Sequence, residues 1–431
     1  MADYDLAVIG AGWAGFNAAI RARELGLKVA LIEQGFVGGT CLNRGCIPTK
    51  ALIRSAKIYS LVKKAKAFGV EVQAPQINFL EIQARKDKIV GQLRSGMQSM
   101  LGGIDFINAQ AQFLSPQEIK AGERILRPKF MLIASGSRPI ELKDFKFDGK
   151  KIISSDQILN LKGLPKSLLI IGGGVIGCEF ASLFSILGAQ VTLAEKMPQL
   201  LPQEDKEIAI KIETLFKKRG IKVNTSTDPA GLNLADYELV LLCIGRAPDT
   251  DGLGLENAGV ALEKGKITVD EYLRTNIPNI YAAGDCTGKV MLAHFAAYQG
   301  EVAAQNLAKA NTKKADDDNV PNCIFTEPQI ASIGLSQDQA LKKGLDIKIN
   351  RFDFLGLGMA RILDETEGFI KIISDKKSEE ILGASIIGPG ATELIATIAL
   401  ARSTGLKLSQ IRQTIFAHPT LSESIREAAK G

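Results

Sequence analysis

The feature that most constrains the fold is an internal repeat, in which a segment near the N-terminus recurs in the second third of the chain. The first copy, residues 9–34, reads IGAGWAGFNAAIRARELGLKVALIEQ, and the second, residues 171–196, reads IGGGVIGCEFASLFSILGAQVTLAEK. Each copy follows a short apolar run and predicts a strand, a tight turn, a helix and a second strand. The positions shared by the two copies are Gly10, Gly12, Gly15, Gly26 and Glu33 in the first, and Gly172, Gly174, Gly177, Gly188 and Glu195 in the second.

These shared residues have the spacing of a dinucleotide-binding turn. The first glycine permits the turn, the second lets the backbone approach a pyrophosphate, and the third lets the helix pack closely on the sheet. The phosphate charge then meets the N-terminus of the helix. The closing glutamate accepts hydrogen bonds from ribose hydroxyls and repels the extra phosphate of NADP. One such motif can arise from packing alone, but two copies predict two dinucleotides with plain riboses.

Length and charge narrow the classes of protein that remain. A chain of 431 residues with 46% hydrophobic content is too long for one ordinary domain, so we expect two to four domains. The 53 basic and 47 acidic residues give a net charge of only +6, which does not indicate a nucleic-acid partner. No stretch approaches the roughly 18 to 20 apolar residues that cross a bilayer. We expect a cytoplasmic protein without a membrane partner.

Four of the six cysteines stand alone in apolar or small-residue surroundings, and each is interpreted as a small buried hydrophobe. They are Cys178, Cys243, Cys286 and Cys323. The other two form a pair separated by four residues, a spacing typical of neither a zinc site nor a thioredoxin motif, so no metal is expected.

This pair is Cys41 and Cys46, and its spacing demands an irregular backbone. In a regular helix their Cα atoms would lie about 8 to 9 Å apart, beyond the roughly 7 Å that a disulfide allows. Gly45 and Pro48 supply the irregularity, because glycine tolerates unusual dihedral angles and proline has no N–H for the helix. A disulfide is then sterically credible, and it could exchange electrons with a flavin bound at the first repeat.

The segment around the pair, GGTCLNRGCIPTK at residues 38–50, resembles the active-site signature of the flavin-dependent disulfide reductases, in the form typical of dihydrolipoamide dehydrogenases. The resemblance extends over nearly the whole chain. Further matching stretches are ASG at 134–136, YAAGDC at 281–286, the segment 321–334 at the start of an interface domain, and AHPTLSE at 417–423.

The resemblance implies an α/β chain with two Rossmann-like domains for FAD and NAD and a C-terminal α+β dimerisation domain. The expected divisions are an FAD-binding domain at 1–143, an NAD-binding domain at 144–256, a central FAD-contacting segment at 257–318 and an interface domain at 319–431. The polar run AKANTKKADDDN at 308–319 supports the last boundary. In the interface domain, FIKIIS and ILGASIIG predict strands, and 393–405 predicts a helix.

The same resemblance assigns FAD to the first repeat and NAD to the second. Lys50 and Glu179 are expected to form an ion pair beside the flavin. A carboxylate behind a pyrophosphate loop costs free energy to bury unless a cation pairs with it. The residues expected at FAD are Gly10, Gly12, Gly15, Glu33, Gly39, Thr40, Lys50, Ala111, Ser135, Gly136, Gly284, Asp285 and Ala293, and those expected at NAD are Gly172, Gly174, Gly177, Glu179, Glu195 and Gly245.

Only two histidines can serve as a proton carrier near neutral pH. His294 resembles a structural position on the flavin side. His418 precedes Pro419, and the resemblance implies a cis bond there and a role for His418 in proton transfer. Glu423, five residues later, could hold the imidazole tautomer and stabilise its charged form. Cys41 lies near one end of the chain and His418 near the other, so the C-terminal domain has to reach the disulfide. The resemblance implies that this reach is between subunits, and we therefore expect a homodimer in which each chain supplies His418 to its partner.

By resemblance, Cys41 exchanges with the substrate, Cys46 faces the flavin, and dihydrolipoyl groups on a carrier protein of a 2-oxoacid dehydrogenase or glycine cleavage complex donate electrons to NAD. A related reductase with another disulfide substrate and a lipoate-linked enzyme of sulfur metabolism remain alternatives. Glu195 disfavours the NADP of glutathione reductase, and the chain end REAAKG lacks the vicinal cysteines of mercuric reductase. A non-catalytic scaffold is disfavoured because Cys41, Cys46, His418 and Glu423 are all present.

Two departures from the family pattern bear on these expectations. The run 223–239 is short where family members carry a longer strand meander, which puts the NAD domain's shape or affinity in doubt. Phe416 stands where dihydrolipoamide dehydrogenases often have a further histidine, which weakens the substrate assignment more than the chemistry.

Overall fold

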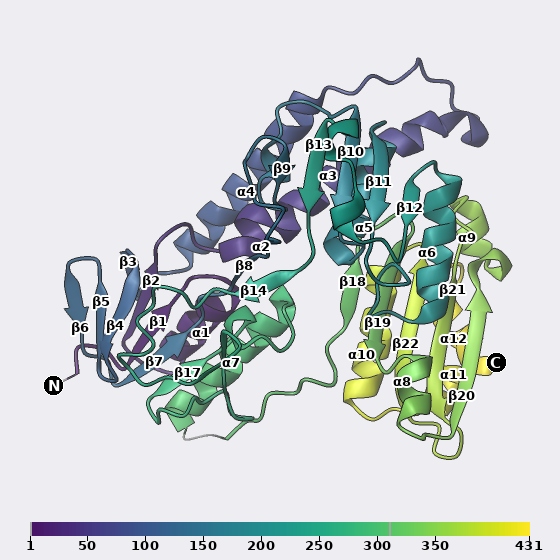
Figure 1. Ribbon diagram of the computed structural model, residues 1–431. Coiled ribbons are helices and arrows are strands. Elements are labelled where there is room, and N and C mark those ends of the chain that lie inside the picture. The colour runs from purple at the N-terminus through teal and green to yellow at the C-terminus, as the bar shows by residue number, and fades with distance from the viewer. Residues whose placement is uncertain (1, 310–311) are drawn as a thin grey trace.

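The computed structural model describes residues 2–309 and 312–431, so two residues of the expected polar linker, 310 and 311, lie outside the described residues. Two parallel five-stranded sheets and one antiparallel five-stranded sheet form the framework of the molecule (Figure 1). Within the described residues, no helix is both long and apolar enough to cross a membrane.

The first parallel sheet has the order β17-β7-β1-β2-β3, with β1 at its centre. β1 is apolar and buried along its whole length, as expected for a strand with both faces covered. Helices α1 and α7 lie side by side against it, and the close approach depends on Gly300, where a Cβ atom would lie 2.1 Å from the Ala14 carbonyl oxygen. The elements are β1 (Leu6–Ile9), α1 (Trp13–Glu24), β2 (Val29–Glu33), β3 (Asp105–Asn108), β7 (Phe130–Ile133), β17 (Ile280–Ala282), η5 (Asp285–Thr287) and α7 (Ala293–Lys309).

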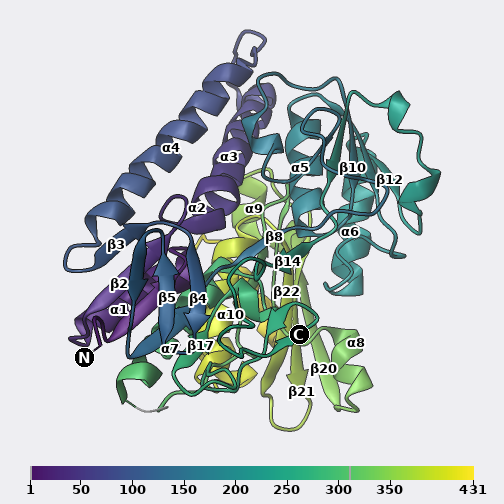
Figure 2. The same ribbon diagram turned by 60° about the vertical axis from the view of Figure 1, so that its left-hand side comes forward.

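Between β2 and β3 the chain forms a long helical excursion, and between β3 and β7 it forms a small antiparallel sheet. Figure 2 shows the two longest helices of the excursion, α3 and α4, running side by side along the outside of the molecule. The elements are α2 (Gly39–Arg44), α3 (Cys46–Lys63), η1 (Ala65–Phe68), α4 (Phe79–Ser99), β4 (Ala111–Ser115), β5 (Glu118–Ala121) and β6 (Arg124–Leu126).

The second parallel sheet, in the order β12-β11-β10-β13-β9, repeats the arrangement of the first around β10. The repeat seen in the sequence is therefore a repeat of structure, as predicted. The short run after β12 holds only the two 3-10 turns η3 and η4 before β13 begins. The elements are β9 (Ile152–Ile153), η2 (Ile158–Asn160), β10 (Ser167–Ile171), α5 (Val175–Ile186), β11 (Gln190–Ala194), α6 (Lys206–Lys218), β12 (Lys222–Asn224), η3 (Pro229–Gly231), η4 (Leu234–Asp236) and β13 (Leu239–Leu242).

The chain also forms two short antiparallel pairs, the first of which links the two parallel sheets. One joins β8 (Ser137–Pro139) to β14 (Arg246–Pro248), so the chain leaves and re-enters the second sheet through adjacent strands. The other joins β15 (Leu262–Glu263) to β16 (Lys266–Ile267).

The C-terminal sheet is antiparallel, in the order β18-β19-β22-β21-β20. The strands and the helix predicted for this region are confirmed as β21, β22 and α10. Helices α10, α11 and α12 cover one face of the sheet (Figure 1). The elements are β18 (Asn322–Ile324), β19 (Gln329–Gly334), α8 (Gln337–Lys342), β20 (Ile347–Asp353), η6 (Phe354–Gly356), α9 (Gly358–Ile362), β21 (Phe369–Asp375), β22 (Ile381–Gly388), α10 (Ala391–Ser403), α11 (Leu408–Gln413) and α12 (Glu423–Lys430).

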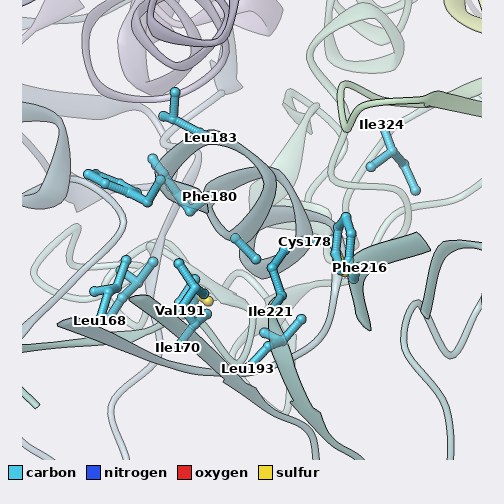
Figure 3. Packing of buried hydrophobic residues seen from close by; sticks show 14 of the residues in the cluster. Leu168, Ile170, Cys178, Phe180, Leu183, Val191, Leu193, Phe216, Ile221 and Ile324 are labelled. Atoms are coloured by element: carbon cyan, nitrogen blue, oxygen red, sulfur yellow. The ribbon is translucent and has the colours of Figure 1, made fainter. Parts of the chain in front are cut away.

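The other face of the C-terminal sheet shares one hydrophobic core with the second parallel sheet. Figure 3 shows this core around α5, with Ile324 of β18 on the side of Phe216 from α6. Ile330, Phe369 and Ile387 of the C-terminal sheet belong to the same cluster. The two parts are therefore packed as one body rather than joined by a loose linker.

Candidate active site

A cavity of about 2090 Å³ lies where the three sheets meet. Both glycine-rich turns, the cysteine pair and β18 line it. The predicted site residues that line the cavity are Gly10, Gly12, Glu33, Gly39, Thr40, Cys41, Cys46, Lys50, Ser135, Gly136, Gly172, Gly174, Glu179, Glu195, Gly245, Gly284, Asp285 and Ala293.

The first glycine-rich turn has the geometry that its residues demand. Gly10 adopts φ +97°, and a Cβ atom there would lie 2.3 Å from the Ala134 carbonyl oxygen. A Cβ atom on Gly15 would lie 1.8 Å from the Gly10 carbonyl oxygen, so only glycine lets α1 start this close to the turn. Gly12 precedes α1 and faces the cavity, which leaves the helix N-terminus open to an anion. These residues fit the pyrophosphate of a dinucleotide.

The second turn has the same close contacts at its first and third glycines as the first turn. Gly172 adopts φ +113°, and its Cβ atom would lie 2.5 Å from the Cys243 carbonyl oxygen. A Cβ atom on Gly177 would lie 1.9 Å from the Gly172 carbonyl oxygen. A Cβ atom on Gly174, in contrast, would meet no atom within 4 Å. The N-terminus of α5 is therefore as accessible from the cavity as that of α1, and it fits a second pyrophosphate.

The closing glutamates have a second task that the sequence did not reveal. Glu33 accepts hydrogen bonds of 2.8 Å from the N–H groups of both Ala11 and Gly35. Glu195 accepts equivalent bonds from Gly173, at 2.5 Å, and from Met197, at 2.7 Å. Each carboxylate thus braces its own glycine-rich turn. Both line the cavity, where each oxygen has a further lone pair for a ribose hydroxyl.

The backbone between the two cysteines is broken, as predicted. Helix α2 ends at Arg44 and α3 begins at Cys46, with Gly45 between them at φ −146° and ψ −110°. Thr49 secures the start of α3 by donating from its N–H and its hydroxyl to the Gly45 carbonyl, at 3.1 and 2.6 Å. Both cysteines are free thiols, and they are hydrogen-bonded to one another.

The two thiols have opposite acidities. The pKa of Cys46 is lowered to about 7, first by the hydrogen bond from Cys41 and also by the charge of Lys50, which together outweigh the effect of burial. The same hydrogen bond and burial raise the pKa of Cys41 above its usual range. Cys46 is therefore the thiol that ionises near neutral pH.

The expected ion pair between Lys50 and Glu179 is present beside the thiols. Lys50 Nζ lies 2.9 and 2.8 Å from the two carboxylate oxygens of Glu179, which is 3% exposed. The backbone N–H of Phe325 donates to the same carboxylate at 2.9 Å, and its ring lies 4.7 Å from Lys50 Nζ. Burial lowers the pKa of Lys50, but the Glu179 charge outweighs it and the pKa is raised. Lys50 is thus held as a cation beside Cys46.

Asp285 anchors a polar chain that sequence reasoning missed. The hydroxyl of Ser137 donates to Asp285 at 2.6 Å and accepts from Arg246 Nε at 2.8 Å. Burial raises the pKa of Asp285, although the Ser137 hydrogen bond opposes this. Ser137 and Arg246 lie on the paired strands β8 and β14, and Arg246 directly follows the predicted Gly245. The position of Arg246 next to the predicted Gly245 was the sequence signal that could have revealed this chain of hydrogen bonds.

His418 and Glu423 meet each other but not the cysteines. His418 Nδ1 lies 2.9 Å from Glu423 Oε1, and the N–H of Thr420 donates to the other Glu423 oxygen at 2.9 Å. That N–H, and then His418, lower the pKa of Glu423. The His418–Pro419 bond is cis, as the resemblance implies. The His418 side chain is 78% exposed, and neither residue is among the described residues that line the cavity.

Three other predicted residues also lie away from the cavity wall. Gly15 and Gly177 pack against their turns instead, as described above. Ala111 is buried in β4 and is absent from the described lining. The second histidine, His294, is held by a contact of 2.8 Å between Nε2 and the Pro321 carbonyl oxygen, and burial lowers its pKa. His294 itself lines the cavity, and the structural role expected for it stays a prediction.

Two further residues line the cavity although the sequence did not single them out as site residues. Trp13, the only tryptophan, lines the cavity and is one of the groups that lower the pKa of Cys41. Cys323 is only half-buried and also lines the cavity, so the interpretation of all four single cysteines as buried hydrophobes holds for Cys178, Cys243 and Cys286 alone.

Family comparisons agree with this geometry. Residues 4–300 match the family model described as pyridine nucleotide-disulphide oxidoreductase, and residues 320–429 match the dimerisation domain of the same family. A dihydrolipoyl dehydrogenase of Bacillus subtilis (strain 168) is 39% identical over 461 residues, with 99% of this chain and 97% of the relative covered. Another from Thermus scotoductus is 39% identical over 453 residues, with 100% and 97% covered.

A solved structure of the same architecture belongs to a protein that is named a flavoprotein disulfide reductase and not a dihydrolipoyl dehydrogenase. A Cu(II) complex of the HOCl-induced flavoprotein disulfide reductase RclA from Escherichia coli superposes with a TM-score of 0.88 at 31% identity. The match covers 100% of this chain and 99% of that protein.

Proposed function

Because this chain belongs to the pyridine nucleotide-disulphide oxidoreductase family, we propose that it is a dihydrolipoyl dehydrogenase. It is an FAD-dependent, NAD-linked oxidoreductase with a dimerisation domain at residues 320–429. The observation that carries the proposal is the hydrogen-bonded thiol pair beside the Lys50–Glu179 ion pair, in a cavity shared with both glycine-rich turns. Full-length similarity to dihydrolipoyl dehydrogenases supports the substrate.

The reaction begins with the cysteines joined as a disulfide. A thiolate of the dihydrolipoyl group attacks the Cys41 sulfur, the Cys41–Cys46 bond breaks, and Cys46 leaves as a thiolate. The second substrate thiol, after losing its proton, attacks the substrate sulfur of the mixed disulfide and releases Cys41. The products are a lipoyl disulfide and two reduced cysteines. A leaving thiol with a pKa of about 7 favours the first step.

The protein's other charged groups support this exchange. Lys50 stabilises the Cys46 thiolate, and Glu179 holds Lys50 in place. His418, supplied by the partner chain and oriented by Glu423, removes the substrate proton. The first glycine-rich turn would hold FAD, which would supply the two-electron carrier between the reduced cysteines and NAD. The net change is oxidation of a dithiol to a disulfide and reduction of NAD⁺ to NADH, with one proton released.

A homodimer is part of the proposal, because the single chain leaves His418 exposed and outside the described cavity lining. The physiological donor would be the lipoyl group of a carrier protein in a 2-oxoacid dehydrogenase or glycine cleavage complex. The alternative is a related flavoprotein reductase with another disulfide substrate, which the similarity to RclA favours.

Anaerobic titration of the purified holoenzyme with dihydrolipoamide tests the substrate. We expect long-wavelength absorbance from the Cys46 thiolate beside oxidised flavin, followed by rapid NADH formation when NAD is added. Reduction by NADH without any response to dihydrolipoamide would move the substrate to another disulfide. A flavoprotein that responds to neither reductant would contradict the enzyme assignment itself.

A further inference from the structure

A single charged residue interrupts the buried strand β21. The strand reads FIKIISD from Phe369 to Asp375, and Lys371 is 1% exposed. Ile370 and Ile372 face the core under α10 and α12, whereas Phe369 faces the core shared with the NAD-binding part. Because side chains alternate along a strand, Lys371 points toward the NAD-binding part as well.

All three N–H donors of the Lys371 ammonium are used. Its Nζ lies 2.6 Å from Asp205, 2.8 Å from Glu207 and 3.3 Å from Gln337. Asp205 is 3% exposed, so this is a buried ion pair with satisfied partners. Arg351 of β20 holds the second oxygen of Glu207, which ties two strands of the C-terminal sheet to one helix end.

Asp205 connects Lys371 to helix α6. It is the N-cap residue of α6 and accepts a hydrogen bond of 3.0 Å from the N–H of Glu207. It also accepts from the N–H of Gln337 at 3.3 Å. The position of the α6 N-terminus is therefore set by a side chain of the C-terminal sheet.

The segment that enters α6 holds the NAD-side glycine turn. The N–H of Leu201 donates to the Gly173 carbonyl at 2.8 Å, and a Cβ atom on Gly173 would lie 2.6 Å from the Leu200 side chain. Gly173 also donates to Glu195, at 2.5 Å. A short path thus runs from Lys371 to Asp205, along the chain to Glu204, whose N–H donates to the Leu201 carbonyl at 2.9 Å, and from Leu201 to the turn at the N-terminus of α5.

We propose that Lys371 is a positioning residue for NAD: through Asp205 it fixes the second glycine-rich turn relative to the C-terminal sheet, and so fixes the nicotinamide for hydride transfer. The inference rests on the proposed function only for the identity of NAD as the hydride acceptor. Phe325, directly after β18, donates its N–H to Glu179 of α5, so the C-terminal part also contacts the helix that follows the second glycine-rich turn.

The test separates the two half-reactions of the holoenzyme by anaerobic rapid mixing. In Lys371→Met, we expect flavin reduction by NADH to slow by about tenfold to hundredfold, because a misplacement near 1 Å has that effect on transfer rates. Flavin reduction by dithiothreitol through Cys41 and Cys46 should stay within about twofold of wild type. A role confined to folding would instead lower the amplitudes of both reactions together, through the folded fraction, and leave the NADH rate constant unchanged.

The control is Lys376→Met, which removes an exposed lysine of the neighbouring turn whose ammonium lies 3.8 Å from Asp346. It should leave both half-reactions unchanged. If Lys371→Met does not fold, the double variant Lys371→Met with Asp205→Asn replaces it, since asparagine keeps the helix cap and removes the unpaired buried charge.

Equal slowing of both half-reactions, or no slowing of the NADH reaction in whichever variant folds, overturns the inference. Neither reaction uses dihydrolipoamide, so an error in the proposed substrate leaves the test readable. A wild-type enzyme that NADH does not reduce would instead refute the proposed function.

Discussion

The two thiols of the redox pair differ in acidity although only four residues separate them. The helix break at Gly45 brings their sulfurs together, and the hydrogen bond between them favours a proton on Cys41 and a thiolate on Cys46. The sequence could predict the break, because it follows from the disulfide distance limit and local backbone preferences. It could not rank the sulfurs, because their difference in acidity comes first from the hydrogen bond that the folded chain forms between them.

The acidity of Cys46 predicts a pH titration. In the dithiol-reduced holoenzyme, long-wavelength absorbance of the thiolate beside oxidised flavin should appear as pH rises, with a midpoint at about 7, since the thiolate forms above its pKa. Replacing Cys41 by alanine removes the largest stabilising hydrogen bond, so the band should persist with a higher midpoint. Cys46→Ala should lack the band, and Cys323→Ala should behave as wild type. A midpoint unchanged in Cys41→Ala would refute the hydrogen-bond explanation.

At the scale of elements, the two glycine-rich turns carry the most predictable part of the structure. Their repeat is local, so residue type and spacing determine turn, helix and closing strand together. The bracing of each turn by its own glutamate was not predicted, since the motif assigns that carboxylate to the ligand. The link from Lys371 to Asp205 was also hidden, because these residues lie far apart in sequence and no spacing pattern joins them.

Because the two turns have equivalent geometry, the same glycine-to-alanine substitution should impair the reaction with NADH at one turn and the binding of FAD at the other. Gly177→Ala must push α5 away from its turn, so the enzyme should keep FAD and react with dithiol while flavin reduction by NADH falls at least about tenfold. Gly15→Ala should yield protein without bound FAD, as seen in its absorbance spectrum. As a control, Gly91 in α4 has open space at Cβ, and Gly91→Ala should stabilise the chain by about 0.5–1 kcal/mol. Loss of FAD from Gly177→Ala would contradict the assignment of FAD to the first turn and NAD to the second.

On the scale of the whole molecule, the single chain holds the thiol pair together but keeps the proposed proton carrier His418 away from it. His418 and Glu423 are joined to each other on the C-terminal domain, and His418 is 78% exposed. Beside it, Ile415 is 96% exposed, which is costly for an apolar side chain that meets only water. The sequence could pair His418 with Glu423 because they are near neighbours. It could suggest the partner's role only through the family resemblance, since intersubunit contacts leave no spacing pattern in one chain.

Hybrid dimers decide whether His418 acts across the interface. Homodimers of Cys46→Ser and of His418→Ala should each lose dithiol-driven NADH formation, the second by about 10²–10⁴-fold, the usual contribution of a proton-transferring side chain. If His418 serves the other chain, a purified heterodimer of the two variants has one site with both defects and one intact site. It should therefore recover about half of the wild-type activity, one site of two. If His418 acted within its own chain, each site would keep one defect and the heterodimer would stay inactive. Differently tagged chains isolate the heterodimer, and NADH-driven flavin reduction in the His418→Ala homodimer checks that its fold and cofactors are intact.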